Sequence, residues 1–273
     1  MTTAEVLLSC AVTNVRQRRA MPTEDASLAV WLREHLGVHL PTRACSPQHT
    51  PPFREFADAY FGRHPLNVWH ASRGFGGKSH MLAALGLAEA CTLGAEVRVL
   101  GGSADQSENV VRYTDGWTAR GTIAALLSDR AGGREAGVTR SRIRLRGGGM
   151  VDALAASTRA VRGPHPSRLR IDEADELDVR ILDAALGQTM ARPGIAAQTV
   201  ISSTHHYPDG TMTEVLRRAS ERGWPVFQWC YKCTMQTPNN PHGGLDPAEV
   251  ERKRLEVPAA MWSAEQGDIP PPT

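Results

Sequence analysis

A glycine-rich segment, "SRGFGGKS", has the residue types and the spacing of a loop that binds phosphate. It matches the pattern GxxxxGK[ST], except that Ser72 stands at the position of the first glycine. Glycines let backbone N–H groups approach a phosphate, Lys78 supplies a compact positive charge, and the Ser79 hydroxyl is a ligand suited to Mg²⁺. The alternative is a glycine-rich loop without a nucleotide. The predicted nucleotide-binding residues are Ser72, Arg73, Gly74, Phe75, Gly76, Gly77, Lys78 and Ser79.

The basic residues of the chain set Lys78 apart. The sequence has 28 arginines and only three lysines, and Lys78 is the only lysine before Lys232. A compact ammonium group fits between the β- and γ-phosphates of a nucleotide, where a planar guanidinium does not. A lysine retained here in an arginine-rich chain therefore favours a phosphate contact.

An adjacent acidic pair, Asp172 and Glu173 in "RIDEADE", follows a candidate strand about a hundred residues after the loop. Nucleotide hydrolysis needs one carboxylate near Mg²⁺ and a second that orients or deprotonates the attacking water. We assign Asp172 to the metal and Glu173 to the water; the alternative is a solvated helix cap. Arg168 and Arg170 interrupt the apolar run. They predict either an exposed face of this strand or arginines directed at a site or a subunit boundary.

A third polar group ends the candidate strand "QTVISST", where Ser202, Ser203 and Thr204 could sense the γ-phosphate and pass its state to the next loop. The adjacent residues His205 and His206 would point in opposite directions from a strand, which argues against a metal site there. Cys230 and Cys233 form a lone CxxC. Without a second pair, zinc is not expected, and His242 is the one further ligand considered.

Strand, glycine-rich turn and helix must follow one another to position a phosphate loop. The sequence predicts a strand over 66–72 before the loop and a helix over 79–94 after it, and further strands over 95–103, 167–171, 198–204 and 225–231. Within 139–157, alternating arginines and "GGG" predict a hairpin with Arg140, Arg142, Arg144 and Arg146 on one face. That face is either a solvated edge or a basic stripe for a phosphate backbone.

The composition is that of a globular protein: 273 residues, 41% hydrophobic and 22% charged. No segment has the length of a transmembrane helix, and the N-terminus does not resemble a secretory signal. Five scattered cysteines fit a reducing compartment, and a net charge of +2 does not by itself indicate a nucleic-acid partner. We predict one α/β domain, with a central, mostly parallel sheet flanked by helices.

Taken in order, the three segments resemble the ATPase domain of the large terminase subunit of tailed double-stranded DNA phages. "SRGFGGKS" is similar to the arginine-bearing Walker A motif of that family, "RIDEADE" to its Walker B motif with the catalytic glutamate, and "SST" to its coupling motif. Gln48 stands where the family often has an adenine-recognising glutamine. The resemblance implies a P-loop NTPase of the ASCE/RecA-like type.

The resemblance also implies a division of the chain. An N-terminal helical segment is expected over 1–45, an ATPase core over 46–237, and a lid or linker over 238–273 leading toward a nuclease domain. That nuclease domain is expected to be absent, so we predict no DNA cleavage.

For activity, the resemblance implies Mg²⁺-dependent hydrolysis of ATP coupled to translocation of double-stranded DNA into a capsid. Arg162, in an "RG" segment before the acidic pair, resembles an arginine finger inserted into a neighbouring subunit. Arg73, within the loop, is the alternative finger and would act in cis; Arg162 would then be a surface arginine. The implied partners are double-stranded DNA, the portal protein, the small terminase subunit and further copies in a ring, with a monomer in isolation. The implied location is the cytoplasm of the infected bacterial host, without a membrane.

Two other functions remain compatible with the motifs. The letters "DEAD" at 172–175, followed by a serine/threonine motif, also resemble a superfamily 2 helicase, that is, another DNA translocase. The second alternative is a nucleotide-binding ring component in which ATP orders an interface and turnover is incidental.

Overall fold

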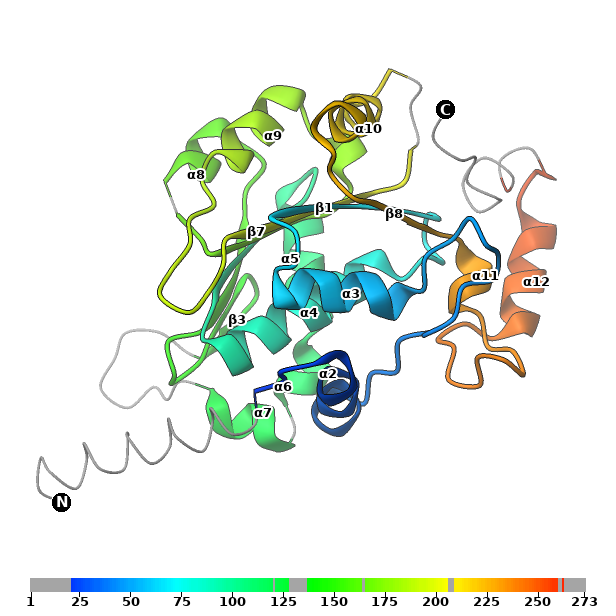
Figure 1. The fold of residues 1–273 in the computed structure, drawn as a ribbon, viewed down its shortest axis with the longest axis horizontal. Helices are drawn as coiled ribbons and strands as arrows, with labels where there is room; N and C mark the ends of the chain where they lie inside the picture. Colours follow the sequence, from blue (N-terminus) through cyan, green and yellow to red (C-terminus); the bar gives the residue numbers. More distant parts are fainter. Residues whose placement is uncertain are drawn as a thin grey trace, which may run out of the picture.

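The computed structural model describes residues 21–119, 121–127, 137–163, 165–205, 209–259 and 262. An eight-stranded sheet forms the centre of the molecule, in the order β3-β4-β5-β2-β6-β7-β1-β8 (Figure 1). Its strands are β1 (Leu66–Ala71), β2 (Glu96–Leu100), β3 (Val138–Thr139), β4 (Arg142–Arg144), β5 (Met150–Leu154), β6 (Arg168–Ile171), β7 (Gln198–Ser203) and β8 (Val226–Trp229).

Most of the sheet is parallel. Strands β5, β2, β6, β7, β1 and β8 pair in parallel, and only β3 and β4 at one edge are antiparallel. Strand β7 lies between β1 and β6, so the strand before the glycine-rich loop and the strand before the acidic pair are separated by one strand. The predicted α/β fold with a mostly parallel sheet is confirmed.

Helices cover both faces of this sheet. Helices α8, α9 and α10 lie on one side, and α3 and α4 lie on the other (Figure 1). The helices before β2 are α2 (Asp25–Trp31), the π-helical turn η1 (Leu32–Leu36), α3 (Pro52–Phe61) and α4 (Lys78–Leu93). The later helices are α5 (Ala104–Arg112), α6 (Asp115–Thr118), α7 (Gly121–Leu126), α8 (Thr158–Arg162), the 3₁₀ turn η2 (Ala174–Glu176), α9 (Val179–Leu186), α10 (Thr211–Arg222), α11 (Tyr231–Thr234) and α12 (Pro247–Glu256).

The two-residue period of the strands divides the apolar side chains between two cores. In β1, Val68 belongs to the core under α9 and α10, whereas its neighbour Trp69 belongs to the core with α3 and α4. The predicted N-terminal helix joins the second core, where Leu28 of α2 and Leu36 of η1 are buried. None of the helices in the described part of the chain is both long and apolar enough to cross a membrane.

The predicted hairpin is present but smaller than expected. Strand β4 pairs antiparallel with β5, and Arg140 precedes β4 in a turn. Arg140 forms ion pairs with Asp105 and Glu108, and Arg142 forms one with Asp152 across the hairpin. The four arginines therefore do not form one continuous stripe, because two of them are neutralised by acidic side chains from different elements.

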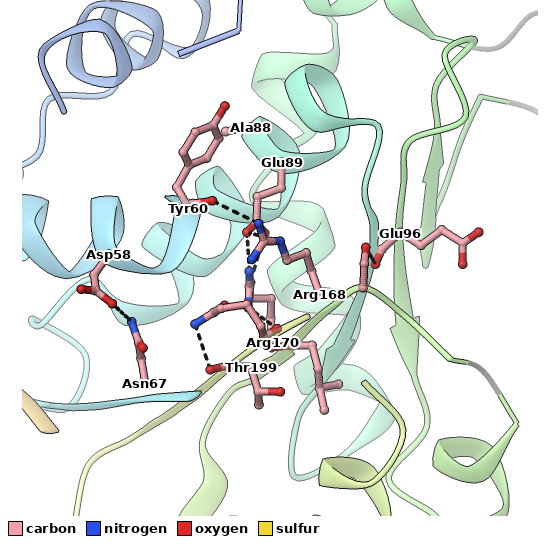
Figure 2. A network of polar contacts seen from close by, with 12 residues as sticks. Asp58, Tyr60, Asn67, Ala88, Glu89, Glu96, Arg168, Arg170 and Thr199 are labelled. Atoms are coloured by element: carbon pink, nitrogen blue, oxygen red, sulfur yellow. Dashed lines mark hydrogen bonds and ion pairs between the residues drawn. The ribbon is translucent and has the colours of Figure 1, made fainter. Parts of the chain in front are cut away.

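Both interpretations of the arginines in strand β6 are wrong. Arg168 and Arg170 are 2% and 0% exposed, so they lie neither on an open face nor at a boundary. Figure 2 shows both guanidinium groups directed at Glu89 of α4, which is itself fully buried. Arg170 donates to Glu89 through two nitrogens, and Nε of Arg168 lies 3.2 Å from Glu89 Oε1. Strand β6 thus uses the side that faces α4 for a buried ion pair and the opposite side, with Leu169 and Ile171, for the other core.

Candidate nucleotide site

The glycine-rich loop connects β1 directly to α4, as predicted from the sequence. Strand β1 ends at Ala71 and α4 begins at Lys78. Gly74 and Gly77 have φ angles of 68° and 70°, which side chains with a Cβ adopt only with strain. The loop leads directly into the first turn of α4, with Gly77 as its N-cap. The backbone N–H groups and the helix dipole at this end of α4 favour an anion.

The fold accommodates serine at the position of the first glycine in this loop. Its side chain is fully buried, and its Oγ accepts a hydrogen bond from the backbone N–H of Tyr231 at 3.2 Å. The glycine that the fold does require is Gly76, where a Cβ would come within 2.5 Å of the Ser72 carbonyl oxygen. Serine is thus accommodated by a contact with the segment after β8, and the close approach occurs at Gly76.

Lys78 is a buried cation whose hydrogen bonds go to neutral groups and whose one ion pair, with Glu173, is long. Only 3% exposed, it donates from Nζ to the carbonyl oxygens of Ala71 and Ser72 at 3.3 and 3.0 Å and to Oγ1 of Thr204 at 3.0 Å. The nearest carboxylate oxygen, Oε1 of Glu173, lies 3.9 Å away. Burial lowers the pKa of Lys78. A phosphate at hydrogen-bond distance would supply a closer negative charge than Glu173 does.

Ser79 and Asp172 meet although 93 residues separate them. The Ser79 hydroxyl donates to Oδ2 of Asp172 at 2.6 Å. The other carboxylate oxygen, Oδ1, is buried and has no hydrogen-bond partner. Burial raises the pKa of Asp172 to about 6, and the adjacent Glu173 contributes to the increase. A half-buried hydroxyl beside a buried carboxylate that has one oxygen left over forms a donor set suited to Mg²⁺.

Glu173 has an unusual backbone. Its φ and ψ are 48° and 53°, and no other non-glycine residue in the described part of the chain has a positive φ. Such a conformation costs about 1–3 kcal/mol and is found mainly at functional sites. It directs the side chain of Glu173, 29% exposed, into a small hollow of about 120 Å³. The residues that line this hollow are Arg73, Gln106, Glu173, Asp175, Glu176 and Thr204.

The hydroxyl residues at the end of β7 link the loop to the acidic segment. Thr204 accepts from Lys78 and donates to the Ala71 carbonyl at 3.0 Å. Ser203 Oγ accepts from the Asp175 backbone N–H at 3.1 Å. Ser202 is buried, and its Oγ has no hydrogen-bond partner in the structure. The three predicted segments therefore meet at the carboxyl ends of β1, β6 and β7.

A larger cleft of about 430 Å³ lies beside the glycine-rich loop. Three segments that are distant in sequence form it: 36–41, 74–81 and 234–245, with Trp117 added from α6. Its wall is mostly apolar and includes the rings of Phe75, His80 and His242. Clefts of this size and character accommodate small organic molecules.

Two predicted residues lie apart from this constellation. Gln48 is exposed in the loop before α3, and it does not line the large cleft. Arg162 is exposed in the last turn of α8, and it does not line the small hollow that Arg73 and Glu173 share. His205 shares a hydrogen bond with Oγ1 of Thr213, and His206 lies outside the described residues.

Sequence reasoning missed a third support of the glycine-rich loop, the segment after β8. Trp229 donates from Nε1 to the Gly76 carbonyl at 2.7 Å, and Thr234 donates from Oγ1 to the Phe75 carbonyl at 2.7 Å. No local pattern predicts these contacts, since they depend on β8 pairing with β1. Asp175 was also missed as a link: its Oδ1 accepts from the Met212 backbone N–H at the start of α10.

The fold is shared with solved viral proteins. The large terminase of bacteriophage HK97 superposes with a TM-score of 0.60 at 14% identity, over 90% of this chain and 55% of that one. The large terminase of a thermophilic bacteriophage, in complex with ADP, gives 0.56 at 10% identity, over 91% and 53%. The same thermophilic phage protein with ATP-gamma-S gives 0.52 at 9% identity, over 91% and 52%.

At these identities the likeness shows a common fold, which confirms the fold that the motif resemblance implied. The chain spans about half the length of the terminases it matches. No family model matches the sequence, and no curated protein is similar to it by sequence.

Proposed function

We propose that this chain is the ATP-hydrolysing motor domain of a viral DNA-packaging terminase, which couples hydrolysis of Mg-ATP to translocation of double-stranded DNA into a capsid. One observation carries the proposal. The Ser79 hydroxyl at the start of α4 lies 2.6 Å from the Asp172 carboxylate at the end of β6, with Lys78 and the strained Glu173 beside them. The shared fold with large terminases supports the same function.

The residues present fit a magnesium ion. Ser79 Oγ and the buried, unpartnered Oδ1 of Asp172 would hold it, directly or through water. When bound, Mg²⁺ neutralises charge on the β- and γ-phosphates. A bound cation would favour the ionised form of Asp172 and so offset the effect of burial, which raises the pKa of this carboxyl.

The hydrolytic step rests on Glu173 and Lys78. Glu173 accepts a proton from a water molecule, whose oxygen bonds to the γ-phosphorus as the bond to the bridging oxygen breaks; ADP and phosphate leave. Lys78 moves its donors from the loop carbonyls to the phosphate oxygens. The backbone strain at Glu173 supports this role because it holds the carboxylate toward the hollow that Arg73 also lines.

The cleft of about 430 Å³ is our proposed site for the nucleoside. It adjoins Gly74–Gly77 on one side, and the ring of Trp117 and the two histidines His80 and His242 offer stacking surfaces. Gln48 would then recognise the base only if its loop moved toward the cleft.

The state of the site would reach the rest of the molecule through hydrogen bonds that already exist. Lys78 contacts Thr204, Ser203 contacts the Asp175 backbone, and Asp175 holds the first turn of α10 through Met212. When Lys78 turns to a phosphate, Thr204 loses a donor. We propose that α10 responds to this change and transmits it toward DNA.

Substitution of Glu173 tests the chemistry. Glu173→Gln keeps the shape of the side chain and removes the base, so turnover of ATP should fall by about 10² to 10⁴-fold while binding of Mg-ATP is retained. The matched control is Glu176→Gln, which lines the same hollow from an exposed position. Hydrolysis and nucleotide binding are measured for both variants with and without double-stranded DNA.

Unchanged turnover in Glu173→Gln would contradict the catalytic assignment. A second outcome would favour a nucleotide-binding ring component over a motor. In that outcome Glu173→Gln loses turnover, but DNA does not change the turnover of assembled wild-type protein.

The arginine finger has a separate test in mixtures. We propose that the exposed Arg162 enters the site of a neighbouring subunit in a ring, and such fingers contribute about 10³ to 10⁵ in rate. Arg162→Ala and Lys78→Met chains, each inactive alone, should regain part of the activity when mixed, because some interfaces then combine an intact site with an intact finger. Arg159→Ala on the same helix is the control. Assembled mixtures without recovery would assign the finger to Arg73 in cis.

A further inference from the structure

Four metal-ligating side chains from two distant segments converge behind the glycine-rich loop. Cys45 and His49 lie in the loop before α3, and Cys230 and Cys233 lie at the start of α11 and within it. Their ligand atoms all lie within 4.8 Å of one another. The lone CxxC therefore has partners in the folded chain. His242, the ligand considered from the sequence, is not one of them; its ring stacks on His39.

The distances within this cluster are close to those of a tetrahedral metal centre. Cys45 Sγ lies 3.6 Å from Cys230 Sγ and 3.2 Å from Cys233 Sγ, and His49 Nδ1 lies 3.1 and 3.7 Å from Cys45 Sγ and Cys233 Sγ. Zinc with Zn–S bonds of about 2.3 Å and Zn–N bonds of about 2.0 Å keeps its ligand atoms roughly 3.5 to 3.8 Å apart. The distances of 3.6 and 3.7 Å fall in that range, and those of 3.1 and 3.2 Å, both from Cys45 Sγ, are shorter, so Cys45 would move outward slightly to share an ion. A disulfide needs about 2.05 Å between sulfurs. The sulfurs are too far apart for disulfides and close enough for a shared ion.

The surroundings of the cluster are those of a closed site. Cys230, Cys233 and His49 are 0%, 2% and 9% exposed, and Cys45 alone is open to solvent. The backbone N–H of Cys45 donates to Cys233 Sγ at 3.4 Å, a contact that stabilises a thiolate. The two segments are also joined by a backbone hydrogen bond of 2.7 Å from Thr50 to Gln228. The ligands are thus held in place by the fold, with one edge through which an ion can enter.

We propose that Cys45, His49, Cys230 and Cys233 bind one structural Zn²⁺. Three thiolates and an imidazole suit zinc by their softness, and four protein ligands leave no open position for catalysis. The ion would fasten the loop that carries Gln48 to α11. From α11 the backbone N–H of Tyr231 and the Thr234 hydroxyl contact Ser72 and Phe75 in the glycine-rich loop. Zinc therefore secures the support behind the nucleotide site, whatever reaction that site performs.

Metal content measures this directly, without nucleotide or activity. Wild-type protein expressed with zinc and purified without chelators should contain one zinc per chain by inductively coupled plasma mass spectrometry. Cys45→Ser and Cys230→Ser should each lower the zinc content or affinity by at least about tenfold. Cys91→Ser is the matched control, since Cys91 is the one free cysteine of the described residues outside the cluster, and it should keep its zinc.

Exchange of the ion for Co²⁺ gives a second readout in wild type, which holds even where Cys230→Ser fails to fold. Tetrahedral thiolate ligation should produce intense visible bands with sulfur-to-cobalt charge transfer in the ultraviolet. Metal-free protein, iron with acid-labile sulfide, a disulfide between these cysteines in freshly reduced protein, or full zinc content in Cys45→Ser would each overturn the proposal.

Discussion

Helix α4 joins two clusters of buried positive charge that have different partners. Near its start, Lys78 donates hydrogen bonds only to neutral groups, two carbonyls and a hydroxyl, and the Glu173 carboxylate lies farther off at 3.9 Å. Near its end, Glu89 receives two arginines of β6, Arg168 and Arg170. A cation with neutral acceptors retains its charge for an anion that arrives later, whereas a cation paired with a carboxylate serves the packing of the fold. The first cluster belongs to the site that we propose for the nucleotide, and the second supports the packing of the fold.

The largest effect expected from this comparison is on stability at the second cluster. Glu89→Gln keeps the shape of the side chain but leaves two buried guanidinium groups without a counter-charge, so the free energy of unfolding should fall by about 3–5 kcal/mol. Arg168→Met should cost less, because it leaves one arginine with one carboxylate. Urea unfolding measures both.

The control for Glu89→Gln is Glu96→Gln, which breaks a partly exposed ion pair with Arg192 and should cost less than about 1 kcal/mol. Equal losses for Glu89→Gln and Glu96→Gln would mean that the buried cluster is not a support. If the folded fraction of Glu89→Gln lost nucleotide affinity, the Glu89 cluster would also contribute to binding, and the two clusters would not have separate roles.

The next effect is on binding at the first cluster. Lys78→Met should weaken nucleotide binding by about 100-fold, because charge-assisted hydrogen bonds contribute about 1.5–3 kcal/mol each. Its stability should be unchanged or higher, since burial already disfavours the charged form of Lys78. Fluorescent-nucleotide titration and urea unfolding give the two values. Lys253→Met on α12 is the control, and a Lys78→Met protein that binds normally but unfolds easily would reverse the roles of the clusters.

The smallest effect is on the pH dependence of stability, through the buried imidazole of His70, which the fold keeps neutral. Burial lowers the pKa of His70 in β1 to about 4, with the charges of His205 and Lys78 adding to the shift. The unfolded chain therefore binds more protons than the folded chain between about pH 6.5 and pH 4, and stability falls as the pH falls through that window. From pH 7.5 to pH 5 this group should cost about 2 kcal/mol.

Replacement of His70 isolates this contribution. His70→Gln should flatten the dependence of unfolding free energy on pH by that amount, whereas the exposed His165→Gln should leave it as in wild type. An identical pH dependence in His70→Gln and wild type would show that His70 is not the group that resists protonation beside Lys78.

Local patterns were sufficient to predict the fold class and the meeting of the three motif segments in the candidate site. Loop and helix are neighbours in sequence, so "SRGFGGKS" after a strand predicted the strand, loop and helix arrangement correctly. The acidic pair and the hydroxyl residues end parallel strands, and parallel strands bring their carboxyl ends to one edge of a sheet. Their meeting with Ser79 and Lys78 therefore followed from the strand predictions. The hairpin with its arginines was less well predicted, because acidic partners from α5 and β5 divide the stripe.

The elements of this protein and the residues at their ends follow from local sequence, because hydrophobic period, glycines and polar strand ends act over a few residues. Tertiary structure alone decided three features that depend on distant partners. Arg170 is buried because Glu89 of another element pairs with it, and Ser72 replaces glycine because Tyr231 supplies a hydrogen bond. Cys230 and Cys233 gain a metal-ligating environment only because β8 pairs with β1 and carries them to Cys45 and His49. Such contacts join residues that local spacing does not relate, and only the packed sheet brings them together.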